Sequence, residues 1–181
     1  MNPARFFYRT YQFWQALSVK PGEAELEQAV SLLSPAQQAL FSRLQPSEKA
    51  HSLRMFRCLV ECGESHPDLL AAALLHDIGK TRFPLRLWQR IWVVLAHRFW
   101  PDRINKWSAS SLPPDQARPG WRTALLVANC HPHWGAELAE QSGSSALVVD
   151  LIRRHQDRLA GPPQNLADHL LQKLQFVDNE N

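Results

Sequence analysis

Cysteine and glycine are both scarce in this chain, and their scarcity excludes several classes of protein. The 181 residues include three cysteines and seven glycines. The odd set of Cys58, Cys62 and Cys130 offers no paired disulfide framework, which favours a reducing compartment over a secreted one. Cys58 and Cys62 could join a metal site, but small buried side chains are the more ordinary interpretation. No glycine pattern of a P-loop or dinucleotide-binding turn is present, and no serine-based triad context.

Long apolar runs are also missing. Residues 1–17 contain Arg5 and Arg9 among several aromatic residues and no long apolar stretch, so they do not read as a signal peptide. Residues 84–100 are more apolar, but this segment is too short to span a bilayer and is interrupted by Arg90 and His97. Hydrophobic residues make up 45% and charged residues 20%, as in an ordinary globular domain with a sizeable core. We therefore expect one cytoplasmic domain.

Acidic residues are rare in one part of the chain, although the net charge of +3 is modest. Between residues 80 and 106 the only acidic residue is Asp102, against the basic residues Lys80, Arg82, Arg86, Arg90, Arg98, Arg103 and Lys106. This excess suits an anionic substrate, a polyanion or an acidic membrane surface, and it also suits a solvated helix face. Residues 84–106 are therefore a candidate contact with a membrane surface or a partner. A core or dimer helix is the stronger interpretation of their apolar part, and a homodimer is compatible with it.

What the sequence does contain is apolar residues at helical spacing along most of its length, with no convincing alternating strand. We predict an all-α fold of seven to nine helices around one core. Residues 1–45 would form N-terminal helices packed on that core, beginning with an amphipathic helix over 1–17. Residues 46–181 would form the core itself, with an insertion at about 81–120 that ends in a loop over 101–120. Residues 121–129 and 132–141 read as separate helices.

The stretch from Ala71 to Lys80 is the centre of the sequence. A run of strong helix formers ends in adjacent His76 and Asp77, and Gly79 follows as a stop signal. We expect the helix to begin after a Ser65 cap and to hold His76 and Asp77 in its last turn. Buried ionisable groups need partners, and a divalent metal is the simplest one for a neutral imidazole beside a carboxylate. The alternative is a histidine interacting with the helix dipole and an aspartate bonded to backbone.

Other candidate ligands occur before and after this pair: His51, His131 in His131-Pro132-His133-Trp134-Gly135-Ala136-Glu137-Leu138, His155, and Asp178 near the end. This order of His, His-Asp, His, His and Asp resembles the HD-domain family of metal-dependent phosphohydrolases from about residue 46 to 178. The string that begins at His131 is similar to a subset of that family, including HD-GYP proteins, with extra histidine ligands. His133 competes with His131 for this role, and the string favours His131.

The resemblance implies an all-α HD-domain bundle and a metal site. His51, His76, Asp77 and Asp178 would hold a first metal. Asp77 would bridge to a second metal held by His131 and His155. The donor set suits one or two divalent transition-metal ions (Mn, Fe, Co, Ni or Zn) better than calcium. The implied activity is hydrolysis of a phosphate ester by metal-activated water. The implied substrate is a phosphorylated small molecule, most naturally nucleotide-like: a nucleotide, a phosphomonoester or a phosphodiester.

Two cations are candidate catalytic residues beside Asp77. Lys80 would meet the substrate phosphate, or it is a helix-end lysine that interacts with the dipole. Arg54 lies three residues after His51 and could grip a phosphate, or it forms a structural salt bridge.

The chain also departs from the HD-GYP pattern. Arg154 stands where that pattern has a second histidine, and Gly161-Pro162-Pro163 stands where it has Gly-Tyr-Pro. The chain is therefore not a standard HD-GYP enzyme, and Arg154 either weakens the second metal site or binds phosphate. The alternative function is a non-catalytic regulatory or scaffold protein of HD-like fold that binds metal or nucleotide.

Overall fold

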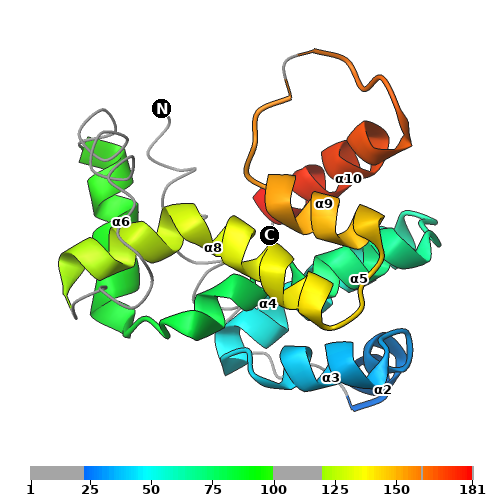
Figure 1. Cartoon of the computed structure of the whole chain (residues 1–181), viewed down its shortest axis with the longest axis horizontal. Coiled ribbons are helices and arrows are strands. Elements are labelled where there is room, and N and C mark those ends of the chain that lie inside the picture. The colour runs from blue at the N-terminus through cyan, green and yellow to red at the C-terminus, as the bar shows by residue number, and fades with distance from the viewer. Residues whose placement is uncertain (1–22, 100–119, 160, 181) are drawn as a thin grey trace.

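The predicted all-α fold is confirmed. A computed structural model describes residues 23–99, 120–159 and 161–180, and within these ranges it contains eight α-helices, one 3₁₀ helix and no strand (Figure 1). The helix expected over residues 1–17 and most of the loop expected over 101–120 lie outside the described residues.

The first two described helices cover one side of the core. They are α2 (Glu23–Ser31) and α3 (Pro35–Ser42). Ser34 caps α3 as the serine–proline pair suggests, because its hydroxyl accepts from the Gln37 amide while the Gln37 side chain accepts from the Ser34 amide. Buried side chains from this part, including Leu33, Phe41 and Leu44, belong to the same apolar cluster as the later helices. The boundary at residue 45 itself stays a prediction.

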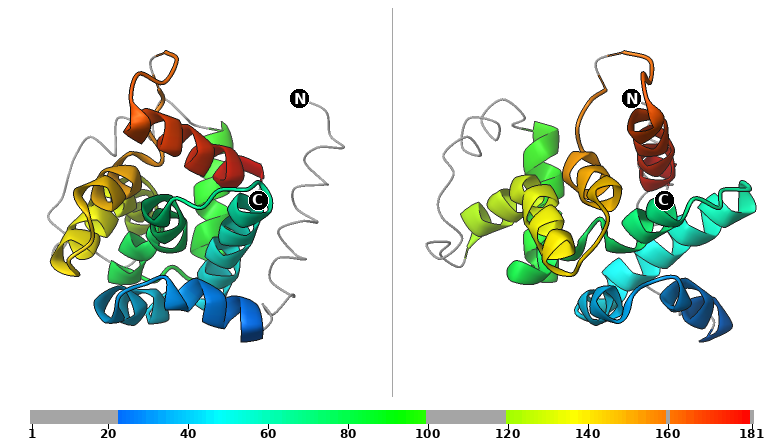
Figure 2. Two further views of the ribbon diagram at one scale, coloured as in Figure 1. Left: turned by 90° about the vertical axis from the view of Figure 1, so that its right-hand side faces the viewer. Right: turned by 45° about the vertical axis from the view of Figure 1, so that its right-hand side comes forward.

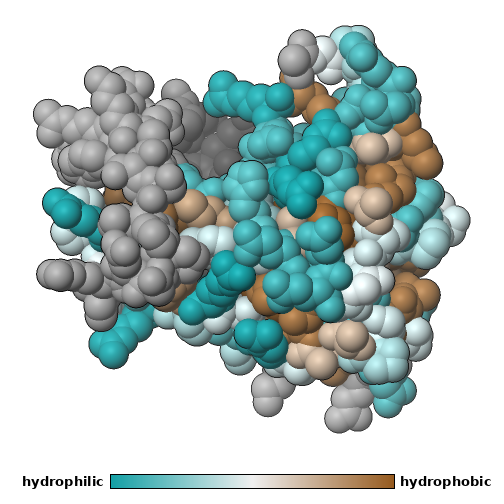
Figure 3. Space-filling view, viewed as in Figure 1, coloured by the Kyte–Doolittle hydropathy of each residue, from teal (hydrophilic) through white to brown (hydrophobic). Residues whose placement is uncertain are grey.

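The centre of the molecule consists of α4 (Pro46–Glu61), α5 (Pro67–Leu75), α9 (Ala146–Arg154) and α10 (Leu166–Glu180). Every side chain from Leu69 to Leu75 is buried, so α5 is enclosed on all sides after its first two residues. α10 contacts α4, α5 and α9, and the two views of Figure 2 show it lying across them. Helices distant in sequence therefore meet around the end of α5. Figure 3 shows that the described part of one outer face is mainly hydrophilic, with small apolar patches between the polar side chains.

The end of α5 differs from the prediction. The helix stops at Leu75, and the chain tightens at His76 and Asp77 into the 3₁₀ helix η1 (Ile78–Arg82). Gly79 does not end the helix with a left-handed turn. It lies inside η1, where a Cβ atom would come within 2.0 Å of the His131 carbonyl oxygen. The glycine is needed for close approach of two backbones. The expected Ser65 cap is also wrong, since His66 occupies the N-cap position before Pro67.

The two helices expected over 121–129 and 132–141 form a single helix, α8 (Trp121–Gln141), with Pro132 inside it. Tertiary packing along η1 and α9 holds this helix together through the proline. α6 (Leu87–Phe99) packs on α8 through a small second cluster of Ala96 and Leu125. In Figure 1, α6 lies at the end of the molecule opposite α10. Among the described helices, none combines the length and apolar character that a bilayer crossing requires.

The cysteines are free thiols. Cys58 and Cys130 are partly buried, whereas Cys62 is exposed, so the expectation of a small buried residue is wrong at Cys62. Within the ranges that the structure describes, no cysteine belongs to a group that could hold a metal ion.

Candidate metal centre

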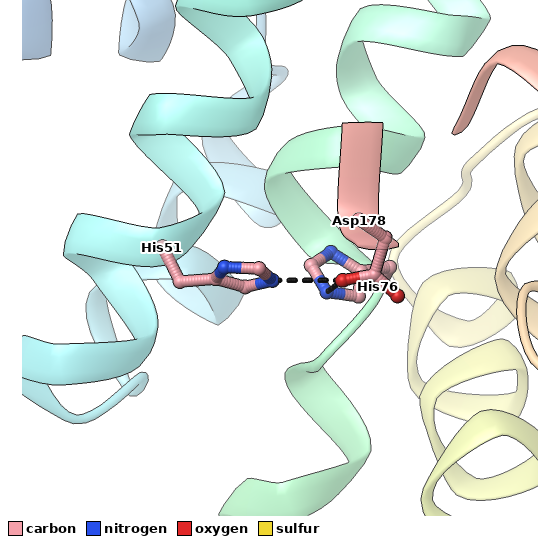
Figure 4. A group of neighbouring side chains, drawn as sticks. All are labelled: His51, His76 and Asp178. Carbon is pink, nitrogen blue, oxygen red and sulfur yellow. Dashed lines mark hydrogen bonds and ion pairs between the residues drawn. The ribbon is translucent and has the colours of Figure 1, made fainter. Parts of the chain in front are cut away.

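The first of two ligand groups joins three helices. His51 comes from α4, His76 caps the end of α5, and Asp178 comes from the last turns of α10. Figure 4 shows their side chains pointing toward one another. The Asp178 Oδ1 atom lies 2.9 Å from His51 Nε2 and 3.8 Å from His76 Nε2. The His51 and Asp178 side chains retain 21% and 29% exposure, so this group is open to solvent on one side.

The second group lies directly beside the first and is closed. It consists of Asp77, His131 from α8 and His155 at the end of α9. His131 Nε2 is 3.2 Å from His155 Nε2 and 3.3 Å from Asp77 Oδ1. All three residues are buried. The structure thus brings together all six residues predicted to bind metal, in two adjacent groups, and their role as ligands stays a prediction.

A backbone carbonyl group orients each of the three buried histidines in the same way. Each ring places Nδ1 against a carbonyl oxygen one turn earlier: His76 on Ala73 at 3.0 Å, His131 on Ala128 at 2.9 Å and His155 on Ile152 at 2.7 Å. A carbonyl oxygen can only accept, so Nδ1 must carry the proton in each ring. In the neutral rings the Nε2 lone pair is then left to point into the centre. This is the arrangement in which a histidine binds a metal.

The His131-Pro132 pair explains how α8 orients the His131 ring. A proline has no N–H, so Pro132 cannot donate to the Ala128 carbonyl four residues earlier. The freed carbonyl oxygen accepts from the His131 ring instead. The glycine of the same string has a related use: a Cβ on Gly135 would come within 3.3 Å of the Gly79 amide nitrogen and 3.5 Å of the His76 carbonyl oxygen. The string therefore orients His131 and lets α8 approach the chain at His76 and Asp77.

The two histidines of the second group do not satisfy each other's lone pairs. Two Nε2 atoms that both present lone pairs lie 3.2 Å apart in His131 and His155. A shared proton would require a charged imidazolium in a buried site. Burial opposes this, and the neighbouring His76 and His131 add to the effect, so that the pKa of His155 is lowered to about 3. The pKa of His76 is also lowered, chiefly by burial. A cation between the rings would satisfy both lone pairs.

Asp77 lies between the two groups and faces both. Its Oδ1 atom is 3.3 Å from His131 Nε2, and its Oδ2 atom is 3.5 Å from His76 Nε2. Burial alone would raise the pKa of this carboxyl, but Lys80 and the surrounding histidines hold the pKa well below its usual value. Asp77 is thus a buried carboxylate with one oxygen toward each ligand group, as expected of a residue that bridges two ions.

The donor atoms suit divalent metal ions in type, and their closest pairs also suit them in spacing. Two ligands that each lie about 2.1 Å from one ion can be no more than about 4.2 Å apart. The closest pairs in the first group, at 2.9 and 3.8 Å, satisfy this limit. The pairs in the second group, at 3.2 and 3.3 Å, also satisfy it. Imidazole nitrogens with carboxylate oxygens suit transition metals.

Of the two predicted cations, Lys80 contacts the site directly. Lys80 Nζ donates to Asp77 Oδ2 at 2.6 Å, so this lysine pairs with the carboxylate that is predicted to bridge two ions. Arg54 is partly buried on α4, one turn after His51, and burial together with nearby Arg57 lowers the pKa of its guanidinium. Neither position tests whether the side chain meets a phosphate, so both roles stay predictions.

Arg154 does not occupy the second group. Its guanidinium donates to Asp150 at 3.0 Å and to Asp168 of α10 at 2.7 Å. These two carboxylates raise the pKa of Arg154. The residue therefore fastens α9 to α10, and the second group forms from Asp77, His131 and His155 without it.

The remaining polar residues include two glutamines that sequence reasoning missed. His133 and His169 are exposed. Gln156, however, places its amide nitrogen 3.4 Å from His131 Nε2 and so lies at the outer edge of the second group. Its position directly after His155 was the available signal, but glutamine is an uncommon ligand. The amide of Gln175, also missed, donates to the carbonyls of Arg154, His155 and Asp157 and holds the chain at the end of α9.

Comparison with protein families gives one match: residues 49–104 match the model of the HD domain. The resemblance to this family is confirmed for that segment. The match contains His51, His76 and Asp77, and it ends before His131, so it does not cover the three later candidate ligands. It also extends past Lys80 into the segment that we interpret as an insertion. Neither the curated proteins nor the solved structures gave a significant match.

Proposed function

We propose that this chain, which carries an HD-domain segment at residues 49–104, is a metal-dependent phosphohydrolase that cleaves a phosphate ester. HD-domain proteins are generally hydrolases, and the groups around Asp77 suit divalent metal. The observation that carries the proposal is the position of Asp77, with one carboxylate oxygen toward His131 and the other toward His76. We propose a nucleotide, phosphomonoester or phosphodiester as substrate.

Two divalent ions bound here would supply electrophilic stabilisation of a phosphoryl group and activation of water. The two ligand groups differ in how far they are exposed to solvent. His131 and His155 are enclosed, whereas His51 and Asp178 are partly exposed. Substrate would therefore reach the centre from the His51–Asp178 side. The buried histidines would bind metal on the opposite side, away from solvent.

Lys80 is placed to serve both the carboxylate and the substrate. An ammonium group has three N–H donors, and the hydrogen bond to Asp77 uses one of them. The Lys80 side chain is 31% exposed, so the remaining donors can reach a phosphate oxygen at the edge of the site. Arg54, on the His51 side, would be a second phosphate contact. We propose both residues as substrate-binding groups rather than ligands.

The first test is metal content after purification without chelator, because it does not depend on knowing the substrate. We expect about two ions per chain in wild type and about one in the His131→Ala variant. The matched control is His133→Ala, which removes an exposed imidazole from the same helix. It should leave the content at the wild-type value. Equal loss in both variants, or no metal in wild type after supplementation with Mn or Fe, would contradict the proposed centre.

The second test is turnover on a panel of nucleotides, phosphomonoesters and phosphodiesters with the metal-loaded protein. Product release that depends on Asp77 supports the phosphohydrolase. The competing function, a non-catalytic regulatory or scaffold protein, is favoured by the burial of the second group, since an enclosed ion can simply fasten helices together. Full metal content with ligand-induced stabilisation and no product on the whole panel would favour that alternative.

A further inference from the structure

The helix α6 carries an apolar face that the described structure leaves exposed. Five large side chains on one side of the helix are involved: Leu87 and Trp88 at 53% exposure, Ile91 at 50%, Val94 at 64% and Leu95 at 40%. We refer to these five residues as the α6 face. They recur at helical spacing, so they form one continuous stripe. Single exposed apolar residues are ordinary, but a contiguous stripe of this kind marks a contact surface.

The α6 face is held rigidly in position. On the opposite side of the helix, Ala96 is buried against Leu125 of α8. Arg90 fastens the helix to the start of α4: its guanidinium donates to Glu48 at 2.8 Å and to Ser47 at 3.0 Å, and it also contacts Gln45. The orientation of α6 therefore does not depend on the α6 face, and the exposed side chains are not there to fix the helix.

The described chain segments that form and flank the α6 face contain no acidic residue. The described residues 78–99 and 120–136, which include all of α6 and most of α8, have no aspartate or glutamate. Three basic residues of this region pair with carboxylates outside it, namely Lys80 with Asp77, Arg82 with Glu137 and Arg90 with Glu48. Arg86, directly before the α6 face, and Arg122, at the start of α8, are exposed. The region combines an apolar stripe with positive charge.

We propose that the α6 face docks on the surface of an anionic lipid bilayer. Tryptophan and aliphatic side chains would enter the region below the headgroups, and the flanking arginines would lie at the level of the lipid phosphates. The thirteen residues of α6 extend about 20 Å, which is too short to cross a bilayer but suits a helix lying along its surface. This docking would bring a hydrolytic centre to membrane-associated substrates, although the proposal does not depend on the activity.

Charge favours a lipid bilayer as the partner of the α6 face over a second copy of the chain or residues 1–22. A second copy of the chain would place one arginine-flanked face against another, and α6 itself has no carboxylate to offset the repulsion. Residues 1–22 of the same chain contain Arg5, Arg9 and Lys20 and no acidic residue, so they offer no complementary charge either. An anionic lipid surface supplies both the apolar medium and the negative charge.

The test is co-sedimentation of the full chain with vesicles. The probes are phosphatidylcholine vesicles and phosphatidylcholine vesicles that also contain phosphatidylglycerol, each at low and high salt. We expect binding to the anionic vesicles that weakens with salt, and a loss of about tenfold or more in the Ile91→Glu variant. The control is Leu166→Glu, because Leu166 is 57% exposed on α10, away from the α6 face. Circular dichroism establishes that both variants fold.

Several results would overturn the proposal. These are no binding to anionic vesicles at low salt, equal binding to neutral vesicles, or equal binding by wild type and the Ile91→Glu variant. Dimerisation in solution that the Ile91→Glu substitution abolishes would assign the α6 face to a second copy of the chain. Protection of Trp88 from quenchers in the free protein, relieved only by deletion of residues 1–22, would assign the face to that segment.

Discussion

Two regions of this molecule reverse the usual distribution of side chains, in opposite ways. Around the end of α5, charged and polar groups are enclosed: Asp77, His131 and His155 are all buried. On α6, large apolar groups are exposed, with Val94 at 64%. Burial of ionisable groups and exposure of a contiguous apolar stripe both cost free energy unless a partner is supplied. On our two proposals, a metal ion would partner the first region and an apolar surface would partner the second.

The two regions also differ in how much structure supports them. Five elements converge on the buried centre, namely α4, α5, α8, α9 and α10, and carbonyl groups orient three of its histidines. The α6 face depends on a single helix that packs on α8. Substitutions should therefore be severe in the first region and mild in the second.

The largest effect is expected at Gly79, because the lack of a side chain at this residue lets η1 and α8 come into backbone contact beside the centre. In Gly79→Ala the new Cβ would lie 2.0 Å from the His131 carbonyl oxygen and 2.7 Å from the Gly135 amide nitrogen. Both neighbours are backbone, so η1 and α8 must separate. We expect a loss of about 3 kcal/mol or more in the free energy of unfolding, measured by urea denaturation. Gly161→Ala, where no atom lies within 4 Å, is the control and should change little.

The next effect is expected for Asp77→Asn, which keeps the shape of the side chain that we propose as the bridge and removes its charge. Lys80 then loses its carboxylate partner, and both ligand groups lose a negative oxygen. We expect metal content to fall and kcat/KM to drop by at least about 100-fold on any substrate that the wild type turns over. Unchanged turnover in a variant with unchanged metal content would exclude Asp77 from the reaction.

A third, intermediate effect concerns the pH dependence of the metal-free protein. The pKa of His155 is lowered from 6.5 to about 3 by burial and the neighbouring histidines. As pH falls from 6.5 toward 3, this residue therefore binds a proton in the unfolded chain but not in the folded chain. The free energy of unfolding decreases as a result. The pKa of Asp178 is lowered from 3.8 to about 2, since the His51 hydrogen bond and His76 outweigh its burial. Its stabilisation is present above 3.8 and is lost as pH falls toward 2.

Urea denaturation at a series of pH values in the presence of chelator measures this effect. The His155→Gln variant should lose part of the slope between pH 6.5 and 4, while His133→Ala should keep it. A metal-free wild type whose stability does not decline between pH 6.5 and 4 would show that the buried histidine accepts its proton in the folded state.

The smallest effect is expected for the α6 face. Val94→Asp places a charge on a side chain that is 64% exposed, and we expect the free energy of unfolding to change by no more than about 0.5 kcal/mol. Metal content should not change. Ala96→Asp, two residues later on the same helix, is the contrast, because Ala96 is 2% exposed and packs on Leu125. This variant should destabilise the protein clearly, since it buries an unpaired charge. Similar losses in the two variants would show that Val94 is covered in the free protein.

Much of the fold could be predicted from the sequence because its signals are local. Helical spacing of apolar residues indicated the all-α class, and the Ser34-Pro35 pair indicated a helix start that the structure shows. The ligand residues could be selected because histidine and aspartate are rarely placed in apolar stretches without a reason. Their order along the chain also resembles a family whose model matches residues 49–104.

Contacts between distant elements decided the rest. Gly79 looked like a helix stop, yet its function is to meet α8, and no local signal states which backbone will approach a glycine. Pro132 looked like a break between helices, yet α8 continues because η1 and α9 pack along it. Arg154 stands where the related pattern has a histidine ligand. Its side chain instead pairs with Asp168 of α10, 14 residues away, and lies outside the second group. Residue type and local order belong to the sequence, whereas the partner of each group depends on chain segments that only folding brings together.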